Sequence, residues 1–335
     1  MNLVYEQWVS ALPRRTRSWK LAAATLVSMA ALGALTLPRA SSASGPARAL
    51  KHGLALGLSD RAADAAKHIT ARRAADARQA HLARSIRRMP DLTQTAADLA
   101  LPGGGSSYCG PVAVSNALAG LAQAGTPRLL PDRPTPRGAQ LALVRQLGSG
   151  RYMGTGANSG TGAAGLMVGL ERYLRDRGFA AELSYQGWRG HPRRFSSGIK
   201  VPSQSAMVAA FETGASVFVN IGWYAPSPRV PGVYRRRGGH WLTLVGTGTD
   251  PRGDRSPETL VFHDPAPWAG EEGARHFASL EALGGGWLIT EEGPFASSGH
   301  HILRGVHVKH PGDVAIVDGM VSLKVTHRAS AANPE

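Results

Sequence analysis

The sequence predicts an α+β fold, in which the helical N-terminal part of the folded domain packs on an antiparallel sheet. Between residues 110 and 213, apolar side chains recur at helical spacing, as at Leu166, Leu170 and Leu174. From residue 216 to 325, short apolar or alternating runs follow, which are typical of strands. Helices and strands do not alternate regularly, which argues against a parallel βαβ architecture. The 335 residues are 43% hydrophobic, enough to bury a core.

Each expected element has a periodic pattern or a boundary signal. Pro111 stands in the first turn of the first helix, where its missing N–H costs nothing. The Gly/Thr-rich stretch 154–162 lacks the Gly-Lys-Ser/Thr ending of a phosphate loop, so we expect an ordinary loop there, with Thr161 as a helix cap. The expected helices cover residues 110–123, 138–147, 163–176 and 203–213, and the expected strands cover residues 216–223, 240–246, 259–262 and 313–325.

Residues 1–43 are expected to be a signal peptide, or alternatively an uncleaved signal anchor. A basic stretch from Arg14 to Lys20 precedes an uncharged, Ala/Leu-rich run at residues 21–37, and small residues follow. Cleavage after Ala43 fits this pattern, since the run is shorter than the roughly 20 residues that span a bilayer. We therefore expect an exported protein, located in the periplasm, outside the cell or on the outer side of the membrane.

The rest of the chain divides into three further segments. Residues 44–100 are rich in Ala and Arg, and their apolar spacing predicts one or two amphipathic helices that serve as a linker or a pro-segment. Pro102 and the three glycines after it end this segment. The folded domain is expected at residues 101–327, followed by a disordered tail at residues 328–335.

Charge and cysteine content exclude several classes of partner and site. The net charge is +15, and the first hundred residues hold 15 basic and 6 acidic side chains. No zinc-finger, homeodomain or ribonucleoprotein signature accompanies this charge, so we expect anionic envelope polymers or a membrane surface as partners of the basic N-terminal region, and no nucleic acid. The single cysteine excludes a disulfide framework and Cys-based metal sites, and we expect no cofactor and no metal.

That cysteine, Cys109, stands in the setting of a nucleophile. It follows a Gly-rich turn at residues 103–105, and the expected helix from Gly110 begins directly after it. Free N–H groups and the positive end of the helix dipole favour a thiolate there, and the same N–H groups can hold the oxyanion of a tetrahedral intermediate. The alternative is an inert, buried cysteine that packs like a small apolar side chain.

A thiolate nucleophile needs a proton donor and a group that orients that donor. His240 follows two glycines and opens an expected apolar strand, and Asp264 ends the next strand, just before Pro265. His263 is a competitor of His240, but the alternation of a strand points it away from Asp264. The alternative interpretation of Asp264 is a structural one, in which it only starts a turn. Together, the order Cys109, His240, Asp264 suits a papain-type site.

These residues resemble the papain-like domain of cysteine-peptidase family 39, best known for peptidases that process bacteriocins after double-glycine leaders. The resemblance covers about residues 105–325 and is closer to the stand-alone exported relatives than to exporter-fused domains. It implies a papain-like fold, with Cys109 as nucleophile, His240 as general base and acid, and Asp264 as orienter. The motifs that carry it are Cys109-Gly110-Pro111, Gly239-His240-Trp241 and Asp264-Pro265.

One departure from the family concerns the oxyanion hole. The family usually has a Gln about six residues before the Cys, and its side-chain amide donates to the oxyanion. Here Gly103 stands at that position, and Gln94 lies farther upstream, where a loop would have to bring it back. Ser106, Ser107 or Tyr108 are the alternative donors near the nucleophile.

Two further features bear on a substrate cleft. Arg235–Arg237 precede the glycines before His240, and near a cleft they would favour acidic substrate segments; a solvated loop is the interpretation we favour. The stretch 185–189 and the pair Trp223-Tyr224 supply aromatic side chains that could line a cleft.

The sequence thus predicts an exported cysteine peptidase or amidase that cleaves a peptide or protein through a thioester intermediate. Two alternatives stay open. One is a peptidoglycan amide hydrolase of another papain-like type, and the other is a catalytically weakened papain-like domain that acts as a binding module.

Overall fold

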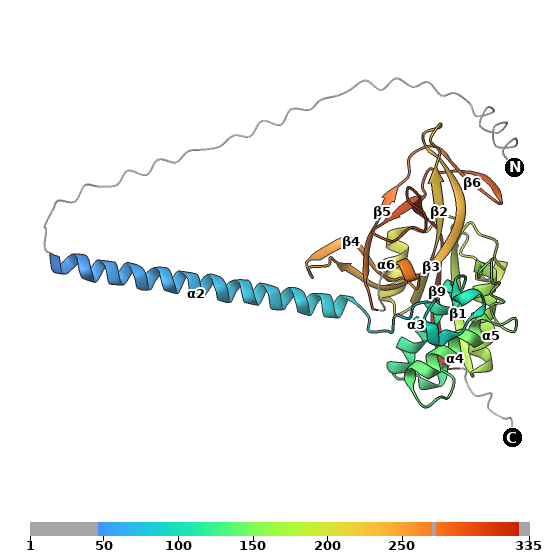
Figure 1. Ribbon diagram of the computed structural model, residues 1–335, viewed down its shortest axis with the longest axis horizontal. Coiled ribbons are helices and arrows are strands. Elements are labelled where there is room, and N and C mark those ends of the chain that lie inside the picture. The colour runs from blue at the N-terminus through green and yellow to red at the C-terminus, as the bar shows by residue number, and fades with distance from the viewer. Residues whose placement is uncertain (1–45, 270–272, 328–335) are drawn as a thin grey trace. The chain divides into compact units, whose positions relative to one another are not determined.

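The computed structural model describes residues 46–269 and 273–327, with side chains from residue 64 onward (Figure 1). The expected signal segment 1–43 and the expected tail 328–335 lie outside the described residues. Contacts divide the chain into two units, residues 1–63 and 64–335, and the second unit contains the folded domain. Within the described residues, none of the helices combines the length and apolar character needed to span a bilayer.

The domain is α+β, as the sequence predicts, and its helices lie close to their expected positions. Two of them start at capping side chains: Thr135 accepts a hydrogen bond from the Gly138 N–H, and Ser203 accepts one from the Ala206 N–H. Thr161, by contrast, caps no helix, since Gly162 holds the N-cap position of α5. The helices are α2 (Pro46–Ser85), α3 (Cys109–Gln123), α4 (Pro136–Gly148), α5 (Ala163–Asp176) and α6 (Gln204–Glu212).

The strands form one nine-stranded sheet that closes on itself in part. Because β2 pairs with both β3 and β9, the pairings β2-β3-β4-β5-β8-β9 return to β2 and make a closed ring. All pairs are antiparallel except β3 with β6, so the expectation of a wholly antiparallel sheet is wrong at that edge. The strands are β1 (Phe179–Gly187), β2 (Ser216–Pro226), β3 (Val233–Thr249), β4 (Arg255–His263), β5 (His276–Ala282), β6 (Trp287–Thr290), β7 (Gly293–Ala296), β8 (His301–Arg304) and β9 (Val314–His327).

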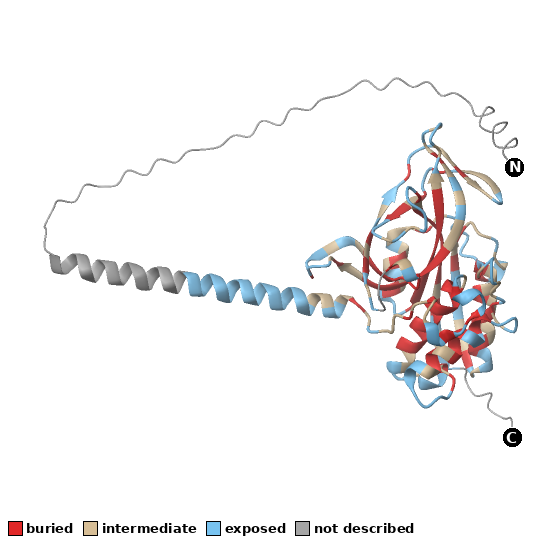
Figure 2. Cartoon of the chain, viewed as in Figure 1, coloured by how far each residue is buried: buried red, intermediate tan, exposed pale blue. Residues whose placement is uncertain are grey.

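The two faces of this sheet bury different apolar clusters. Along β2, Val217 and Val219 pack with strand residues of the ring and with Met207 of α6, whereas Phe218 between them packs with α3, α4 and α5. This alternation is the period of two that a strand imposes on its side chains. Helices α3 to α5 therefore cover one face of the sheet, and burial concentrates in these helices and the central strands (Figure 2).

The segment before the domain differs from its expected form. A single helix, α2, replaces the one or two amphipathic helices, and its residues 64–80 are all exposed, so no apolar stripe is buried there (Figure 2). Leu92 and Leu99 are buried with Tyr108 of the loop before α3, so the compact domain begins before residue 101.

One contact fixes the register between the first domain helix and the sheet. The Thr243 hydroxyl of β3 donates to the Ala113 carbonyl of α3 at 2.9 Å, and both residues are fully buried. This bond holds the start of α3 next to β3. Cys109 lies before Ala113 in α3, and His240 lies before Thr243 in β3, so the two candidate residues are carried by adjoining elements.

Candidate active site

Cys109 is the first residue of α3, and the turn before it has the backbone that its glycines predict. Gly103, Gly104 and Gly105 all adopt positive φ, and the Tyr108 N–H donates to the Gly105 carbonyl at 2.9 Å. The first N–H groups of an α-helix have no partner within the helix. Cys109 is 8% exposed and is one of the residues that line a cleft, at the N-terminal end of α3 where such donors occur.

His240 lies inside a strand, although the sequence analysis placed it at the strand's start. β3 begins at Val233, because the arginines before the glycines continue the pairing with β2. The Asn220 side-chain amide donates to the His240 carbonyl at 3.0 Å and fixes its backbone. The two glycines before His240 are needed for close approach, since a Cβ at Gly238 would crowd the Trp223 ring.

Asp264 and Cys109 both contact the His240 ring. Asp264 follows the last residue of β4, and its Oδ1 lies 2.6 Å from His240 Nε2. The Ala266 N–H donates to the same oxygen at 2.9 Å and holds the carboxylate in place. Cys109 lines the same cleft as His240, and its side chain is one of the neighbours that raise the pKa of His240. Because Asp264 occupies Nε2, Nδ1 is the nitrogen left to face the sulfur.

These contacts control the charge of the imidazole. Burial lowers the pKa of His240, but the Asp264 charge, the hydrogen bond that the ring donates to Asp264 and the contact with Cys109 outweigh it and raise the pKa to about 10. Burial raises the pKa of Asp264, and the neighbouring His240 charge and hydrogen bond overcome this effect and lower it. At neutral pH the pair is therefore an imidazolium and a carboxylate.

His263 takes no part in this arrangement, as its position in the strand predicts. Its Nδ1 lies 3.9 Å from Asp91 Oδ1, and burial lowers the pKa of His263 to about 4. His263 is thus a neutral, buried side chain at physiological pH, and His240 is the imidazole of the site.

The side chains of Ser107 and Tyr108, which the sequence analysis named as alternative oxyanion donors, are not both placed for that role. Tyr108 packs in an apolar cluster with Leu92 and Val112, and does not line the cleft, so its assignment as a donor is wrong. Ser107 does line the cleft, but its hydroxyl donates to the Ala157 carbonyl at 2.6 Å. A hydroxyl has one proton, so Ser107 has no further donor to offer while this bond is made.

Gln94 does lie beside the loop before Cys109. The chain between them folds back, as the sequence analysis required. The Gln94 Nε2 donates to the Ser106 carbonyl at 2.8 Å, and its backbone N–H donates to the Pro265 carbonyl at 2.8 Å. Gln94 therefore ties the loop before Cys109 to the residue that follows Asp264. The signal for this return was the run of three glycines, which turns the chain sharply.

Gly105 is the position on which this return depends, and its replacement with Ala tests it. A Cβ at Gly105 would overlap the Gln94 carbonyl, whereas one at Gly104 would meet nothing within 4 Å, although both have positive φ. We expect Gly104→Ala to lower the free energy of unfolding by about 1 kcal/mol. Gly105→Ala is expected to lower it by about 2 kcal/mol more, because the loop must move. Urea unfolding of the two variants measures the difference, and equal losses would contradict the contact.

The cleft that contains Cys109 and His240 encloses about 320 Å³. Trp223 stacks on the His240 ring with centroids 5.4 Å apart, and Trp268 lies 6.3 Å from the same ring. The loop 158–163 forms another part of the wall, where the Thr161 carbonyl accepts from the Trp241 indole at 2.8 Å. The aromatic wall shields the imidazole from water, which strengthens its interaction with Asp264.

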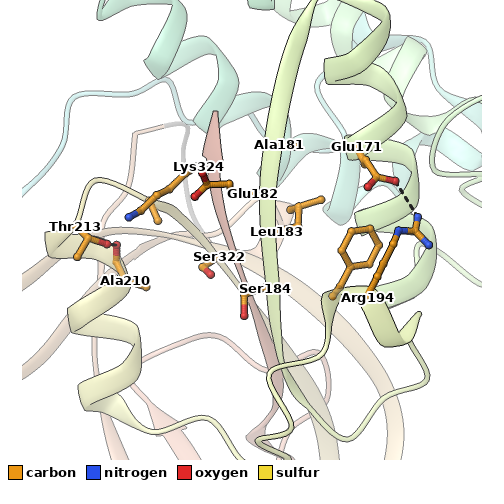
Figure 3. Close-up of a pocket in the computed structure, with 12 residues that line it drawn as sticks. Glu171, Ala181, Glu182, Leu183, Ser184, Arg194, Ala210, Thr213, Ser322 and Lys324 are labelled. Carbon is orange, nitrogen blue, oxygen red and sulfur yellow. Dashed lines mark hydrogen bonds and ion pairs between the residues drawn. The ribbon is translucent and has the colours of Figure 1, made fainter. Parts of the chain in front are cut away.

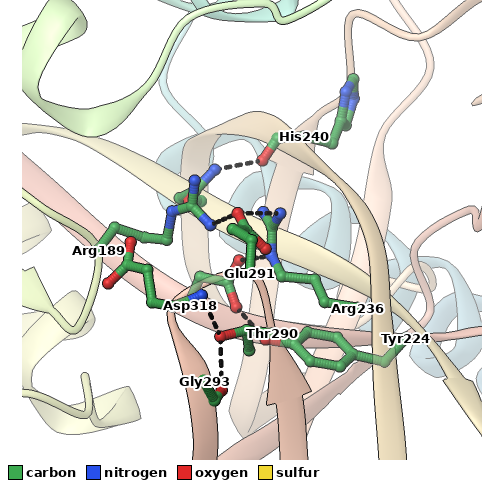
Figure 4. Close-up of polar contacts among 10 residues, drawn as sticks. Arg189, Tyr224, Arg236, His240, Thr290, Glu291, Gly293 and Asp318 are labelled. Atoms are coloured by element: carbon green, nitrogen blue, oxygen red, sulfur yellow. Dashed lines mark hydrogen bonds and ion pairs between the residues drawn. The ribbon is translucent and has the colours of Figure 1, made fainter. Parts of the chain in front are cut away.

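The basic triplet belongs to the cleft, against the expectation of a solvated loop. Arg236 and Arg237 line it, and Arg236 Nε donates to Asp318 Oδ2 at 2.9 Å beneath it. Glu291 bridges Arg236 and Arg189, the last residue of the expected aromatic stretch (Figure 4). The triplet lies in β3 because Arg235 and Arg236 pair with Ala225 and Tyr224 of β2, and of its three arginines only Arg236 and Arg237 line the cleft.

A second concave surface lies elsewhere in the domain, between α5, β1, α6 and β9 (Figure 3). A Glu171–Arg194 ion pair of 2.8 Å stands at its side, and Lys324 lines it. Among the described residues that line it there is no Cys or His, so it holds no second thiol–imidazole pair. In the described part of the chain, no three His, Cys, Asp or Glu side chains gather to hold a metal ion.

Comparison with known protein families finds no family model that matches the chain, and no curated protein matches it. The chemistry of the cleft is therefore the basis on which a function can be inferred.

Proposed function

We propose that the chain is a thiol hydrolase, a cysteine peptidase or amidase that cleaves an amide bond through a thioester on Cys109. The observation that carries the proposal is that one imidazole contacts both the cysteine at the head of α3 and a buried carboxylate. A charged His240 beside the sulfur stabilises a thiolate, which is the nucleophilic form of cysteine. Asp264 fixes the orientation of the ring and balances its charge.

We also infer that the fold is papain-like. Such a fold carries the nucleophile on a helix of one part and the imidazole on a sheet of the other, with the cleft between them. Here α3 carries Cys109, β3 carries His240, and the Thr243 hydroxyl joins the two elements. The resemblance of the sequence to family 39 supports the same inference, and the export expected from residues 1–43 stays a prediction.

The proposed reaction has two steps that use the same imidazole. The Cys109 thiolate attacks the substrate carbonyl, the C–N bond breaks, and the His240 imidazolium gives its proton to the leaving amine, so that a thioester and a neutral imidazole remain. His240 then takes a proton from water as the water oxygen attacks the thioester. The C–S bond breaks, the acid leaves, and the thiolate and imidazolium are restored.

The loop before Cys109 holds the oxyanion donors in this proposal. We assign the oxyanion donors to the N–H groups of Cys109 and Gly110 at the start of α3, since the first N–H groups of a helix have no partner within it. Gln94 acts as a positioning residue, because its amide binds the Ser106 carbonyl and its backbone binds Pro265. One residue, through its side chain and its backbone, thus joins the nucleophile's loop to the orienter's loop.

Product analysis tests the proposed function. The full chain is incubated with a mixture of short peptides and, separately, with purified peptidoglycan, and mass spectrometry identifies new amines and acids. We expect cleavage of at least one class, with an acyl group on Cys109 as intermediate, and none by the Cys109→Ala chain. Cleavage confined to peptidoglycan assigns the amide hydrolase alternative.

Two results would contradict a thiol hydrolase. Equal cleavage by the Cys109→Ala chain would show that another group does the chemistry. Binding of peptide or peptidoglycan without cleavage by the unaltered chain would assign the binding-module alternative.

A further inference from the structure

The charges in the cleft point to a class of substrate. Among the residues that the structure describes, four basic side chains and one acidic side chain line the cleft that holds Cys109 and His240. An excess of one sign inside a cleft attracts groups of the opposite sign and raises their local concentration. The four basic residues are Arg189, Arg236, Arg237 and Lys309, and the acidic residue is Glu291.

Ion pairs within the domain compensate the two inner arginines and also engage Arg237, but among the described residues they leave Lys309 without a counter-charge. Arg236 is bound by Asp318 and Glu291, and Glu291 also binds Arg189, so this inner group is compensated (Figure 4). Arg237 is half exposed and lies 3.4 Å from Asp313. In the described part of the chain, Lys309 is exposed and forms no ion pair. The positive charge without a partner, that of Lys309, therefore lies at the outer wall.

Lys309 is held close to the reacting imidazole by one intervening ring. Its Nζ lies 6.0 Å from the centroid of Trp223, and that ring stacks on His240 at 5.4 Å. One residue of an extended peptide spans about 3.3–3.6 Å. The Lys309 ammonium group can thus reach a substrate side chain that lies one or two residues from the bond that Cys109 attacks.

Trp223 supplies a second, independent indication of a ligand. Its side chain lines the cleft and is 7% exposed, and its indole N–H has no hydrogen-bond acceptor within the described structure. A buried donor without an acceptor costs free energy until a ligand provides one. A carboxylate accepts from an indole N–H and pairs with an ammonium group at the same time.

We propose that this wall is a carboxylate subsite, at which Lys309 and Arg237 bind a carboxylate of the substrate while Trp223 donates to it. The inference rests on the proposed thiol hydrolase function and names its substrate class, an acidic peptide or amide. The carboxylate is either that of an acidic side chain or that of a chain end, and both sources offer the same two oxygens.

Matched peptidyl chloromethyl ketones test the subsite on the full chain. Each probe alkylates Cys109 with loss of chloride, and the two probes carry Glu or Gln at the residue before the reactive group. We expect the Glu probe to react about fivefold faster at low salt, the size of a partly exposed ion pair. The advantage is expected to shrink as salt rises, because the pair lies at the outer wall.

Three variants assign the effect to its residues. Lys309→Gln and Arg237→Gln are each expected to lower the ratio of the Glu rate to the Gln rate toward one. Lys324→Gln, which removes a cation from the second concave surface (Figure 3), is expected to leave the ratio as it is. A peptide acid that protects Cys109 better than its amide, without a Glu advantage, assigns the subsite to a chain-end carboxylate.

The outcomes separate this proposal from the one on which it rests. Equal rates for the two probes and equal protection by acid and amide, with labelling that still depends on His240, overturn the subsite and leave the thiol hydrolase intact. Labelling no faster than that of a free thiol overturns the thiol hydrolase, and the carboxylate subsite with it.

Discussion

Replacing His240 with Gln is expected to slow alkylation of Cys109 by iodoacetamide at pH 7 about hundredfold, the lower end of what a positioned acid–base group contributes. Gln keeps much of the size and hydrogen-bonding capacity of the ring but cannot carry its charge. Without an imidazolium beside it, the sulfur loses the partner that stabilises a thiolate. Because Cys109 is the single cysteine of the chain, quenched time points and intact mass report its modification alone.

The matched control for this prediction is His68→Gln. His68 lies in the exposed part of α2, so its replacement is expected to leave the alkylation rate unchanged. Equal rates for the His240→Gln chain and the unaltered chain would mean that the imidazole does not activate the sulfur, and would contradict the proposed catalytic pair.

Replacing Asp264 with Asn is expected to lower the free energy of unfolding at pH 6 by about 3 kcal/mol, since it leaves a buried imidazolium without its counter-charge. The pKa of His240 is raised from 6.5 to about 10, so its stabilising effect is fully present below pH 6.5 and is lost as pH rises through 10. The pKa of Asp264 is lowered, so its effect is present above its usual range and is lost as pH falls through the lowered value.

The measurement is denaturant unfolding between pH 4 and pH 10. The unaltered chain is expected to lose stability toward pH 10, and the Asp264→Asn chain is expected to show a smaller loss, because the carboxylate is the main cause that raises the pKa of His240. Asp132→Asn, at an exposed loop, is the control. Parallel pH curves for the Asp264→Asn and unaltered chains would contradict the ion pair.

The periodic helices were predictable from the sequence, and the short strands were not. The expected helix over residues 163–176 matches α5 because Leu166, Leu170 and Leu174 mark one buried face. Strands β5 to β8 have only four to seven residues, which is too short for an alternating pattern to mark them clearly. Their pairing is decided by hydrogen bonds between distant segments, as when β6 pairs with the start of β3.

The candidate site likewise contains residues that the sequence indicates and residues that it does not. The sequence marks Cys109 by the helix pattern that follows it and Asp264 by the proline after it, whereas the glycines before His240 lie inside β3 and do not mark a strand start. Gln94 was uncertain, since its position depends on the positive φ of the three glycines. The role of Lys309 could not be predicted, because it reaches the cleft only through the packing of Trp223 against His240.

The pKa of His240 is the quantity that tests the central claim most directly, and nitrogen NMR of the histidine rings measures it. The His240 signals are assigned by their loss in the His240→Gln chain. We predict that both ring nitrogens stay protonated at pH 8, with a pKa of about 10 that falls in the Cys109→Ala chain, since contact with Cys109 helps to raise it. A ring that titrates near 6.5 and does not respond to Cys109→Ala would contradict the triad.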